Sequence, residues 1–353
     1  MAVDPRKGKA TVASKRAIQS EGSRSSKISL SLAFDMYYNA KRAEGLRDRT
    51  LADCRSYWRY FLEWLEQDRP EVVEVDQITT EIVRSYVGYM MHDHTRYGTV
   101  ESRQKDSRKL SPATVSSRLR AVQSMCKFWE GEGLLLSDPA VKIKPPRMDV
   151  KEKPIITEEE LSALLSAPDT DTYAGYRDYV LILLLVDTGL RINEALNLRE
   201  LYIDMNARCI RLPAELNKNR KPRIIPLSVA VLRELIKLME ETRSYFDTDF
   251  CFVANYGEPL KADHFRKRLL QHAGDAGIDV KKTPVTPHRL RDYFCTQYLL
   301  NGGDLFTLQR IVGHADIKTT QGYVKPSELA IKNSHEQFSP LARIGKRRYK
   351  VEK

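Results

Sequence analysis

The sequence lacks the long hydrophobic segments that anchor a protein in a membrane or direct its export. The longest apolar run, Val180 to Val186, has seven residues, whereas a helix that spans a bilayer needs about 20. The charged residues near the N-terminus are not followed by the apolar core of a signal peptide. We therefore expect a cytoplasmic protein with no membrane partner, and we interpret the apolar run as a buried helix.

Cysteine is scarce and shows no disulfide or metal-binding pattern. The five cysteines are an odd number, and no two are spaced as C-x-x-C, which is typical of reduced thiols in a reducing compartment. The G-x-x-x-x-G-K-[ST] phosphate loop is also missing. The nearest approach to a metal cluster is His92-Asp93-His94, which we interpret as a helix terminus. The sequence predicts no metal, nucleotide or other cofactor.

Positive charge is in excess. Lysine and arginine number 58 against 47 acidic residues, giving a formal net charge of +11. A protein this basic is commonly matched to a polyanion. Composition alone leaves DNA, RNA and an anionic membrane surface open, although the short apolar run disfavours the membrane.

A proline-rich stretch divides the chain. At 353 residues it exceeds the usual size of one domain, and Pro145, Pro146 and Pro154 interrupt the apolar periodicity between the two halves. The basic arm that precedes the first half either solubilises the protein or touches phosphates. The predicted segments are the arm at 1–28, a helical domain at 29–140, a linker at 141–156, a second domain at 157–326, and a C-terminal helix with a basic tail at 327–353.

Apolar periodicity predicts a mainly α fold with a small antiparallel β-sheet in the second domain. In the first domain, helix starts are expected at Thr50, at Thr79 or Thr80, and at Ser111 followed by Pro112. Thr157 and Glu160 form a capping box that opens the second domain. Later helices are predicted at 175–188, 228–243 and 261–274. Two short strands are predicted at 209–212 and 223–227, around a polar turn at 217–221.

Two basic residues in the second domain occupy positions suited to phosphate chemistry. Arg191 follows Gly189 and is expected in the first turn of a helix, where the side chain and the helix N-terminus both favour an anion. Lys218 is at the tip of the predicted hairpin, where a lysine can protonate a leaving oxygen. Taken singly, a surface arginine and a solvated turn lysine are the simpler explanations.

Histidine, arginine and tyrosine follow later in the chain. His288 and Arg291 are three residues apart, so they would share one helical face. His314 can hydrogen-bond a phosphate oxygen, and Tyr323, nine residues later, can act as a covalent nucleophile once its proton is removed. Each also has a structural explanation, because the chain contains 17 tyrosines and most tyrosines simply pack.

In combination, these residues resemble the signature of the tyrosine recombinase, or phage integrase, family. The ordered set is Arg191, Lys218, His288-x-x-Arg291, Gly313-His314 and Tyr323. The resemblance covers roughly Thr157 to Tyr323, and the first half is similar to the family's helical core-binding domain by pattern and position. It implies a two-domain, C-shaped clamp around double-stranded DNA that carries a specific recombination site. It also implies a homo-tetramer that exchanges strands through a Holliday junction, and it allows accessory recombination factors.

The resemblance also implies a role for each residue. Tyr323 would attack the scissile phosphate and form a 3′-phosphotyrosine, while Arg191 and Arg291 neutralise the nonbridging oxygens. Lys218 would protonate the leaving 5′ oxygen, His288 would assist proton transfer at the nucleophile, and His314 would bind the phosphate. Such chemistry requires neither ATP nor a metal.

Some positions depart from the family pattern or leave a choice open. Asp292 follows Arg291 where family members often have a second histidine, and it could pair with a neighbouring arginine or tune His288. Lys221 lies on the same turn as Lys218 and could replace it, although Lys218 has the usual spacing of five residues before the second strand. The candidate DNA contacts are Ser116, Ser117, Arg118, Arg120 and Lys221, with an ordinary surface helix at 111–128 as the alternative. The segment after Tyr323 would dock on a neighbouring subunit or on its own domain.

Other functions fit parts of this pattern. A non-catalytic DNA-binding regulator with a recombinase fold would have no use for a nucleophile, and a type IB topoisomerase would share the chemistry while acting as a monomer. Within the family the choice is between a Xer-type resolvase of chromosome dimers and the integrase or transposase of a mobile element. The basic arm, the polar insertion at 93–110 and the basic tail after Gly345 favour the mobile element.

Overall fold

The computed structural model describes two compact parts of the chain, one within residues 1–151 and the other within 152–353. The described residues are 27–94, 109–147, 154–217 and 219–323, with His335 and Ser339. Lys218, most of the predicted arm and insertion, and nearly all of the C-terminal segment lie outside them. Among these described residues, no helix is long and apolar enough to cross a membrane.

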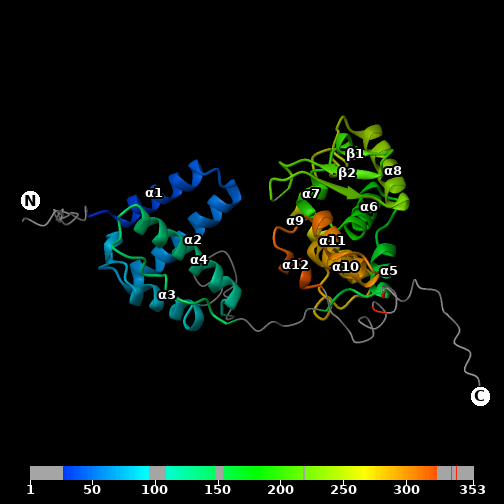
Figure 1. Ribbon diagram of the computed structural model, residues 1–353. Helices are drawn as coiled ribbons and strands as arrows, with labels where there is room; N and C mark the ends of the chain where they lie inside the picture. Colours follow the sequence, from blue (N-terminus) through cyan, green and yellow to red (C-terminus); the bar gives the residue numbers. More distant parts are fainter. Residues whose placement is uncertain are drawn as a thin grey trace, which may run out of the picture. The chain divides into compact units, whose positions relative to one another are not determined.

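The first unit is a helical bundle organised around α4. Its elements are α1 (Leu30–Ala43), α2 (Asp48–Asp68), the 3-10 helix η1 (Val75–Gln77), α3 (Thr80–His92) and α4 (Pro112–Gly131). Helix α4 packs against each of the other three α-helices (Figure 1). Trp129 Nε1 donates a hydrogen bond to the Ala33 carbonyl at 2.8 Å, and Phe34 stacks on Trp58 with ring centroids 5.1 Å apart. Aromatic packing therefore fixes this unit.

Local capping explains where two of these helices begin. Thr79 accepts a hydrogen bond from a backbone N–H of α3, and Ser111 does the same for α4, so both predicted starts are confirmed. The expected start at Thr50 is wrong, because α2 begins at Asp48. An acidic residue in the first turn is favourable at the positive end of the helix dipole, and Asp48 supplies it. Helix α3 ends at His92, as the sequence predicts.

The second unit combines helices with one antiparallel sheet of three strands in the order β1-β2-β3. Its helices are α5 (Glu158–Ser166), α6 (Tyr173–Thr188), α7 (Ile192–Leu196), η2 (Glu200–Tyr202), α8 (Val229–Tyr245), α9 (Ala262–Asp275), α10 (Pro287–Leu300), α11 (Leu305–Val312) and α12 (Ile317–Gln321). Its strands are β1 (Ile203–Asp204), β2 (Cys209–Leu212) and β3 (Arg223–Pro226). The predicted pair of strands is confirmed as β2 and β3, with Ile210 opposite Ile225. Strand β1 has two residues, too few to show an alternating pattern.

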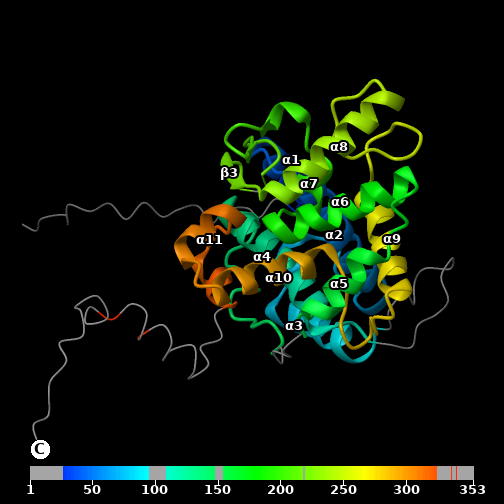
Figure 2. The same cartoon turned by 90° about the vertical axis from the view of Figure 1, so that its right-hand side faces the viewer.

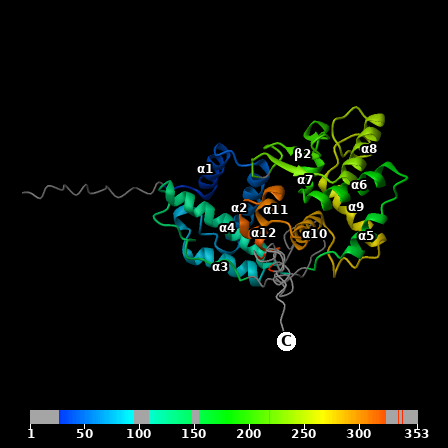
Figure 3. The same ribbon diagram turned by 45° about the vertical axis from the view of Figure 1, so that its right-hand side comes forward.

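Helix α6 forms the centre of the second unit. It lies between α8 and α10 in all three views (Figure 1, Figure 2 and Figure 3) and packs against both. Most of the apolar run in the sequence is fully buried here, including Val180, Leu181, Leu184 and Leu185. The run is long because this part of α6 is covered on several sides. The capping box of Thr157 is present at the start of α5. The packing of α6 against α8 and α10 positions the C-terminus of α6, where the candidate site begins.

Candidate active site

Two glycines in the left-handed backbone conformation end the helices that border the site. Gly189 follows α6 with a φ of +61°, and Gly313 follows α11 with a φ of +67°. Any other residue would be strained there, and a Cβ would also collide with Phe294 at Gly189 and with Arg223 at Gly313. Both glycines therefore turn the chain sharply and present backbone carbonyls at helix C-termini.

Arg291 of α10 is held by those carbonyls. Its side chain donates to the Gly189 carbonyl at 2.5 Å and to the Val312 carbonyl at 2.8 Å. Arg291 is only 2% exposed. Burial, followed by the positive charge of Arg191, lowers the pKa of Arg291 to about 10. Neutral carbonyls at the negative ends of two helix dipoles stabilise the guanidinium without neutralising it, so its charge stays available to an anion.

Arg191 is the N-cap residue of α7 and contacts the same turn. Its Nη1 lies 2.9 Å from Glu194 Oε1, and its Nη2 donates to the Gly313 carbonyl at 3.3 Å. Glu194, which is 2% exposed, also binds Arg223 Nη2 at 2.6 Å. Burial pushes the pKa of Glu194 upward, but the hydrogen bonds and charges of Arg223 and Arg191 outweigh it and lower that pKa. One buried carboxylate thus orients two arginines.

The turn between β2 and β3 rests against Gly313. Asn219 Nδ2 donates to the Gly313 carbonyl at 2.9 Å, and Arg223 Nη1 donates to Asn217 Oδ1 at 3.1 Å. Lys218 itself lies outside the described residues, whereas Lys221 is exposed. Asn217 and Asn219 lie on either side of the predicted lysine. Asn217 is therefore held next to Arg223, and Asn219 is held at the carbonyl that Arg191 also binds.

His314 and Tyr323 form a stacked pair. Their ring centroids are 6.2 Å apart with an interplanar angle of 12°, and His314 Nδ1 is 3.0 Å from Thr320 Oγ1. Burial, followed by the positive charges of Arg291 and Arg191, lowers the pKa of His314 to about 4. The imidazole is therefore neutral at physiological pH and can contribute a hydrogen bond without adding a charge.

The hydroxyl of Tyr323 is bound by Asp292. Tyr323 Oη donates to Asp292 Oδ1 at 2.7 Å, and Arg289 Nη1 donates to the other carboxylate oxygen at 2.9 Å. Burial and the neighbouring Asp292 raise the pKa of Tyr323. His288 Nε2 is 3.8 Å from Asp292 Oδ1, and the His288 side chain is 75% exposed. His288 and Arg291 share α10 as predicted, but one faces solvent and the other is buried.

The structure brings four of the six predicted residues together around the Val312–Gly313 turn and places His288 at the edge of this cluster, beside Asp292. Arg191 and Arg291 bind this turn, His314 follows it, and Tyr323 stacks on His314. Three further residues contact this cluster, although the sequence pattern assigned them no role in the site: Glu194, Arg223 and Asn219. Asp292, expected to pair with an arginine or to tune His288, binds the tyrosine hydroxyl as well. The spacing Arg191-x-x-Glu194 was a usable signal, because residues three apart at a helix start can pair.

Comparisons with known proteins agree with this geometry. The family model described as "Phage integrase family" matches residues 154–329. The tyrosine recombinase XerD of Listeria monocytogenes is 33% identical over 239 residues, which cover 66% of this chain and 78% of that protein. XerD of Listeria innocua is 29% identical over 310 residues, which cover 85% of this chain and 95% of that protein. The chain belongs to the tyrosine recombinase, or phage integrase, family.

Solved structures of other recombinases share the fold. A lambda integrase dimer bound to a COC′ core site has a TM-score of 0.63 and 16% identity, covering 85% of this chain and 78% of that one. The Tn1549 transposon integrase in complex with transposon right end DNA has a TM-score of 0.64 and 19% identity, covering 87% and 99%. The protein is therefore a tyrosine-type site-specific DNA recombinase, of a family that acts without metal ions or ATP.

Within the first unit of this recombinase, two of the predicted DNA contacts need correction. Ser116 is 3% exposed and Arg118 is 8% exposed, and the Arg118 guanidinium lies over the Tyr60 ring at 3.9 Å. Both side chains belong to the core face of α4, since they flank the buried stripe of the helix. Ser117 and Arg120 are exposed and remain available to a partner.

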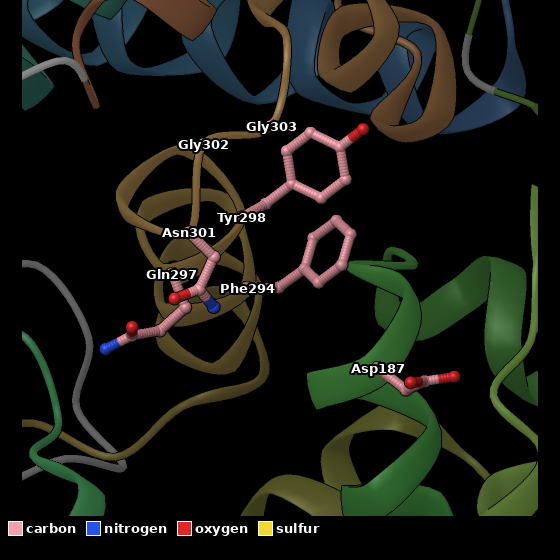
Figure 4. Close-up of a pocket in the computed structure, with 7 residues that line it drawn as sticks. All are labelled: Asp187, Phe294, Gln297, Tyr298, Asn301, Gly302 and Gly303. Carbon is pink, nitrogen blue, oxygen red and sulfur yellow. The ribbon is translucent and has the colours of Figure 1, made fainter. Parts of the chain in front are cut away.

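The second unit of the recombinase also contains a pocket that is separate from the cluster. It has a volume of about 420 Å³ and lies between α10 and the end of α6. Figure 4 shows the rings of Phe294 and Tyr298 projecting from the same side of α10, across from the part of α6 that carries Asp187. None of the five predicted residues that the structure describes lines this pocket. The cluster thus lies outside the pocket.

Proposed function

We propose that this recombinase breaks and rejoins DNA through a covalent bond between Tyr323 and the 3′ phosphate of the cleaved strand. The observation that carries the proposal is the convergence of Arg191, Arg291, His314 and Tyr323 on the Val312–Gly313 turn. A tyrosine hydroxyl next to two cations is suited to attack a phosphodiester, because the cations offset the charge on the nonbridging oxygens.

Each neighbouring group has a part in the transition state. Arg191 and Arg291 stabilise the pentavalent phosphate, and the neutral imidazole of His314 donates a hydrogen bond to it. Lys218 protonates the departing 5′ oxygen, with Lys221 as the alternative on the same turn, and the bond from Asn219 to Gly313 supports that placement. His288 assists proton transfer near the tyrosine, from its place beside Asp292.

DNA recognition follows from the two units and from the excess of positive charge. The helical domain at 29–140 and the catalytic domain at 157–326, joined by the linker at 141–156, both bind the DNA. Ser117 and Arg120 on the exposed face of α4 contact the backbone or groove of double-stranded DNA. The working form is a homo-tetramer on a Holliday junction, the state in which lambda integrase has been solved.

The biological task that we propose is the integration and excision of a mobile element in the cytoplasm, at the nucleoid. The support is the chain's extra length: the match to XerD of Listeria innocua covers 95% of that protein but 85% of this chain. The basic arm at 1–28, the polar insertion at 93–110 and the basic tail after Gly345 are the segments that we assign to this task. The alternative is a Xer-type resolvase of chromosome dimers, which the identity to XerD favours.

A covalent-trapping experiment tests the chemistry. Duplexes that bind the full-length chain are selected from a randomised pool, nicked near the bound site, and incubated with the protein. We expect a protein–DNA adduct on a denaturing gel for the wild type and none for Tyr323→Phe. Equal adduct formation by both proteins contradicts the proposal, and complete loss of activity in excess chelator indicates a metal-dependent nuclease instead.

A second experiment separates the two biological tasks. The gene is deleted in its host, and the chromosomal copies of the selected site are sequenced. If the protein serves a mobile element, deleting its gene leaves host division normal and abolishes the circular form of the DNA between the sites. If the protein is a dimer resolvase, the deletion instead produces chains of cells with unsegregated chromosomes. In that case no circular form of the DNA between the sites is found with or without the gene.

A further inference from the structure

We infer that Asp292 is the general base that takes the proton from Tyr323 during strand cleavage, an inference that rests on the proposed function of Tyr323. Tyr323 Oη already donates a hydrogen bond to Asp292 Oδ1 at 2.7 Å. A general base must lie within about 2.6–3.2 Å of the atom whose proton it removes, and this oxygen meets that requirement. His288, the residue expected from the sequence, faces solvent and is close to Asp292.

The carboxylate is fixed in the orientation that the step requires. Arg289 Nη1 donates to Oδ2 at 2.9 Å, which leaves Oδ1 for the tyrosine. The Asp292 side chain is only 10% exposed, so water competes little for either oxygen. The other charged or titratable groups that face the pair are His288, Arg291 and Cys295 on α10, together with His314 against the tyrosine ring.

The need for a base follows from the surroundings of the phenol. Burial and the hydrogen bond to Asp292 raise the pKa of Tyr323 above its ordinary value of 10. Spontaneous ionisation at neutral pH therefore supplies almost no phenolate, and the proton must leave as the bond to phosphorus forms. Forming an aryl phosphate removes electron density from Oη, so transfer to the carboxylate becomes favourable in the transition state.

The step balances without any co-reactant. Tyr323 Oη forms a bond to phosphorus, and the bond between phosphorus and the 5′ oxygen breaks. The phenolic proton moves to Asp292 Oδ1, and the 5′ oxygen receives a proton from the lysine of the β2–β3 turn. In religation the 5′ hydroxyl attacks phosphorus and returns its proton to the lysine, the bond between phosphorus and Tyr323 Oη breaks, and Asp292 returns its proton to Oη.

The test isolates the nucleophile's side of the reaction. A selected duplex is synthesised with sulfur in place of the 5′ bridging oxygen at the scissile phosphate. A thiolate leaves without a proton, because ordinary thiols have a pKa of about 8.5, so the lysine no longer influences the rate. The rate of adduct formation is then measured between about pH 6 and pH 9 for wild type, Asp292→Asn, Asp292→Glu and Arg289→Gln.

The expected results distinguish a base from a structural residue. Wild type gives a nearly flat profile, whereas Asp292→Asn is about 100-fold slower at pH 7 and its rate rises about tenfold per pH unit, since the phenolate must now form first. Asp292→Glu restores part of the rate with a flat profile. Arg289→Gln, which loses the anchor but keeps the carboxylate, also stays flat.

Two results overturn the inference, and one of them needs no variant. A flat profile for Asp292→Asn shows that the side chain only positions the tyrosine. A wild-type rate that itself rises tenfold per pH unit shows that no base acts, even where Asp292→Asn does not fold. In both cases wild type still forms an adduct that Tyr323→Phe lacks, so the assignment of the nucleophile stands independently.

Discussion

The carboxylate of Glu194 lies 2.6 Å from Nη2 of Arg223, in an ion pair whose side chains are 2% and 7% exposed. The same carboxylate binds Arg191, which also contacts the Gly313 carbonyl. Glu194 is thus the buried counter-charge between two arginines. A third cation, Arg291, stands close enough to Arg191 for their charges to interact.

Replacing Glu194 should therefore damage both stability and catalysis. Glu194→Gln leaves a buried guanidinium without a counter-charge, and removing one partner of a buried pair costs about 3 kcal/mol. Chemical denaturation measures the loss. Glu200→Gln, which removes a surface pair with Arg243, is the matched control and should cost under about 1 kcal/mol. Equal losses for the two variants would show that Glu194 is not an essential buried counter-charge.

Gly313 should tolerate no side chain. Gly313→Ala places a Cβ against Arg223 Nη1 in addition to straining the left-handed backbone. Gly302 has a φ of +86°, and a Cβ added there would meet nothing within 4 Å, so Gly302→Ala isolates the strain of the left-handed backbone, about 1–2 kcal/mol. We expect Gly313→Ala to lose clearly more stability and to slow adduct formation, while Gly302→Ala changes stability alone. Identical behaviour in both assays would contradict this assignment.

Stability should depend on pH through His314. Its pKa is about 4 in the folded protein against 6.5 for the ordinary group, so the unfolded chain binds more protons between these values. The contribution of His314 is therefore complete above about pH 6.5 and is lost as the pH falls toward 4. After allowance for solvent screening of this half-buried ring, the loss is on the order of 1 kcal/mol.

Thermal melting between those pH values measures the effect. His314→Gln should flatten the pH dependence of the melting temperature relative to wild type. His264→Gln, at an exposed histidine of α9, is the matched control and should leave the dependence unchanged. The prediction fails if the His314 variant keeps the wild-type slope.

The first unit offers a paired test of burial against DNA contact. Arg118→Ala removes a buried guanidinium that packs on Tyr60 and should lower the free energy of unfolding by about 2 kcal/mol. Arg120→Ala should leave stability unchanged, weaken DNA binding and reduce the salt dependence of binding by about one phosphate contact. Chemical denaturation measures the stability of both variants, and fluorescence anisotropy over a range of salt concentrations measures their DNA binding. A smaller salt slope for Arg118→Ala than for Arg120→Ala would reverse the assignment of the two residues.

Local features of the fold were predictable because their causes are local. The capping residues Thr79, Ser111 and Thr157 mark helix starts through bonds that span three residues. The strands β2 and β3 follow from short apolar segments around a polar turn. Periodicity did not separate Ser116 and Arg118 from the exposed face of α4, because polar side chains were taken as exposed without regard to their place on the helix.

The sequence by itself determined the family, the helical character of both units and the order of the candidate residues, since these depend on residue type and spacing. Only the tertiary structure decided which groups meet. Arg191 reaches a carbonyl 122 residues away, and Tyr323 meets an aspartate 31 residues away. Such contacts depend on how α6, α10 and α11 pack against one another. Contacts between residues this far apart produce no repeating pattern in the sequence. Thus Tyr323 could be singled out from the sequence, whereas its bond to Asp292 required the fold.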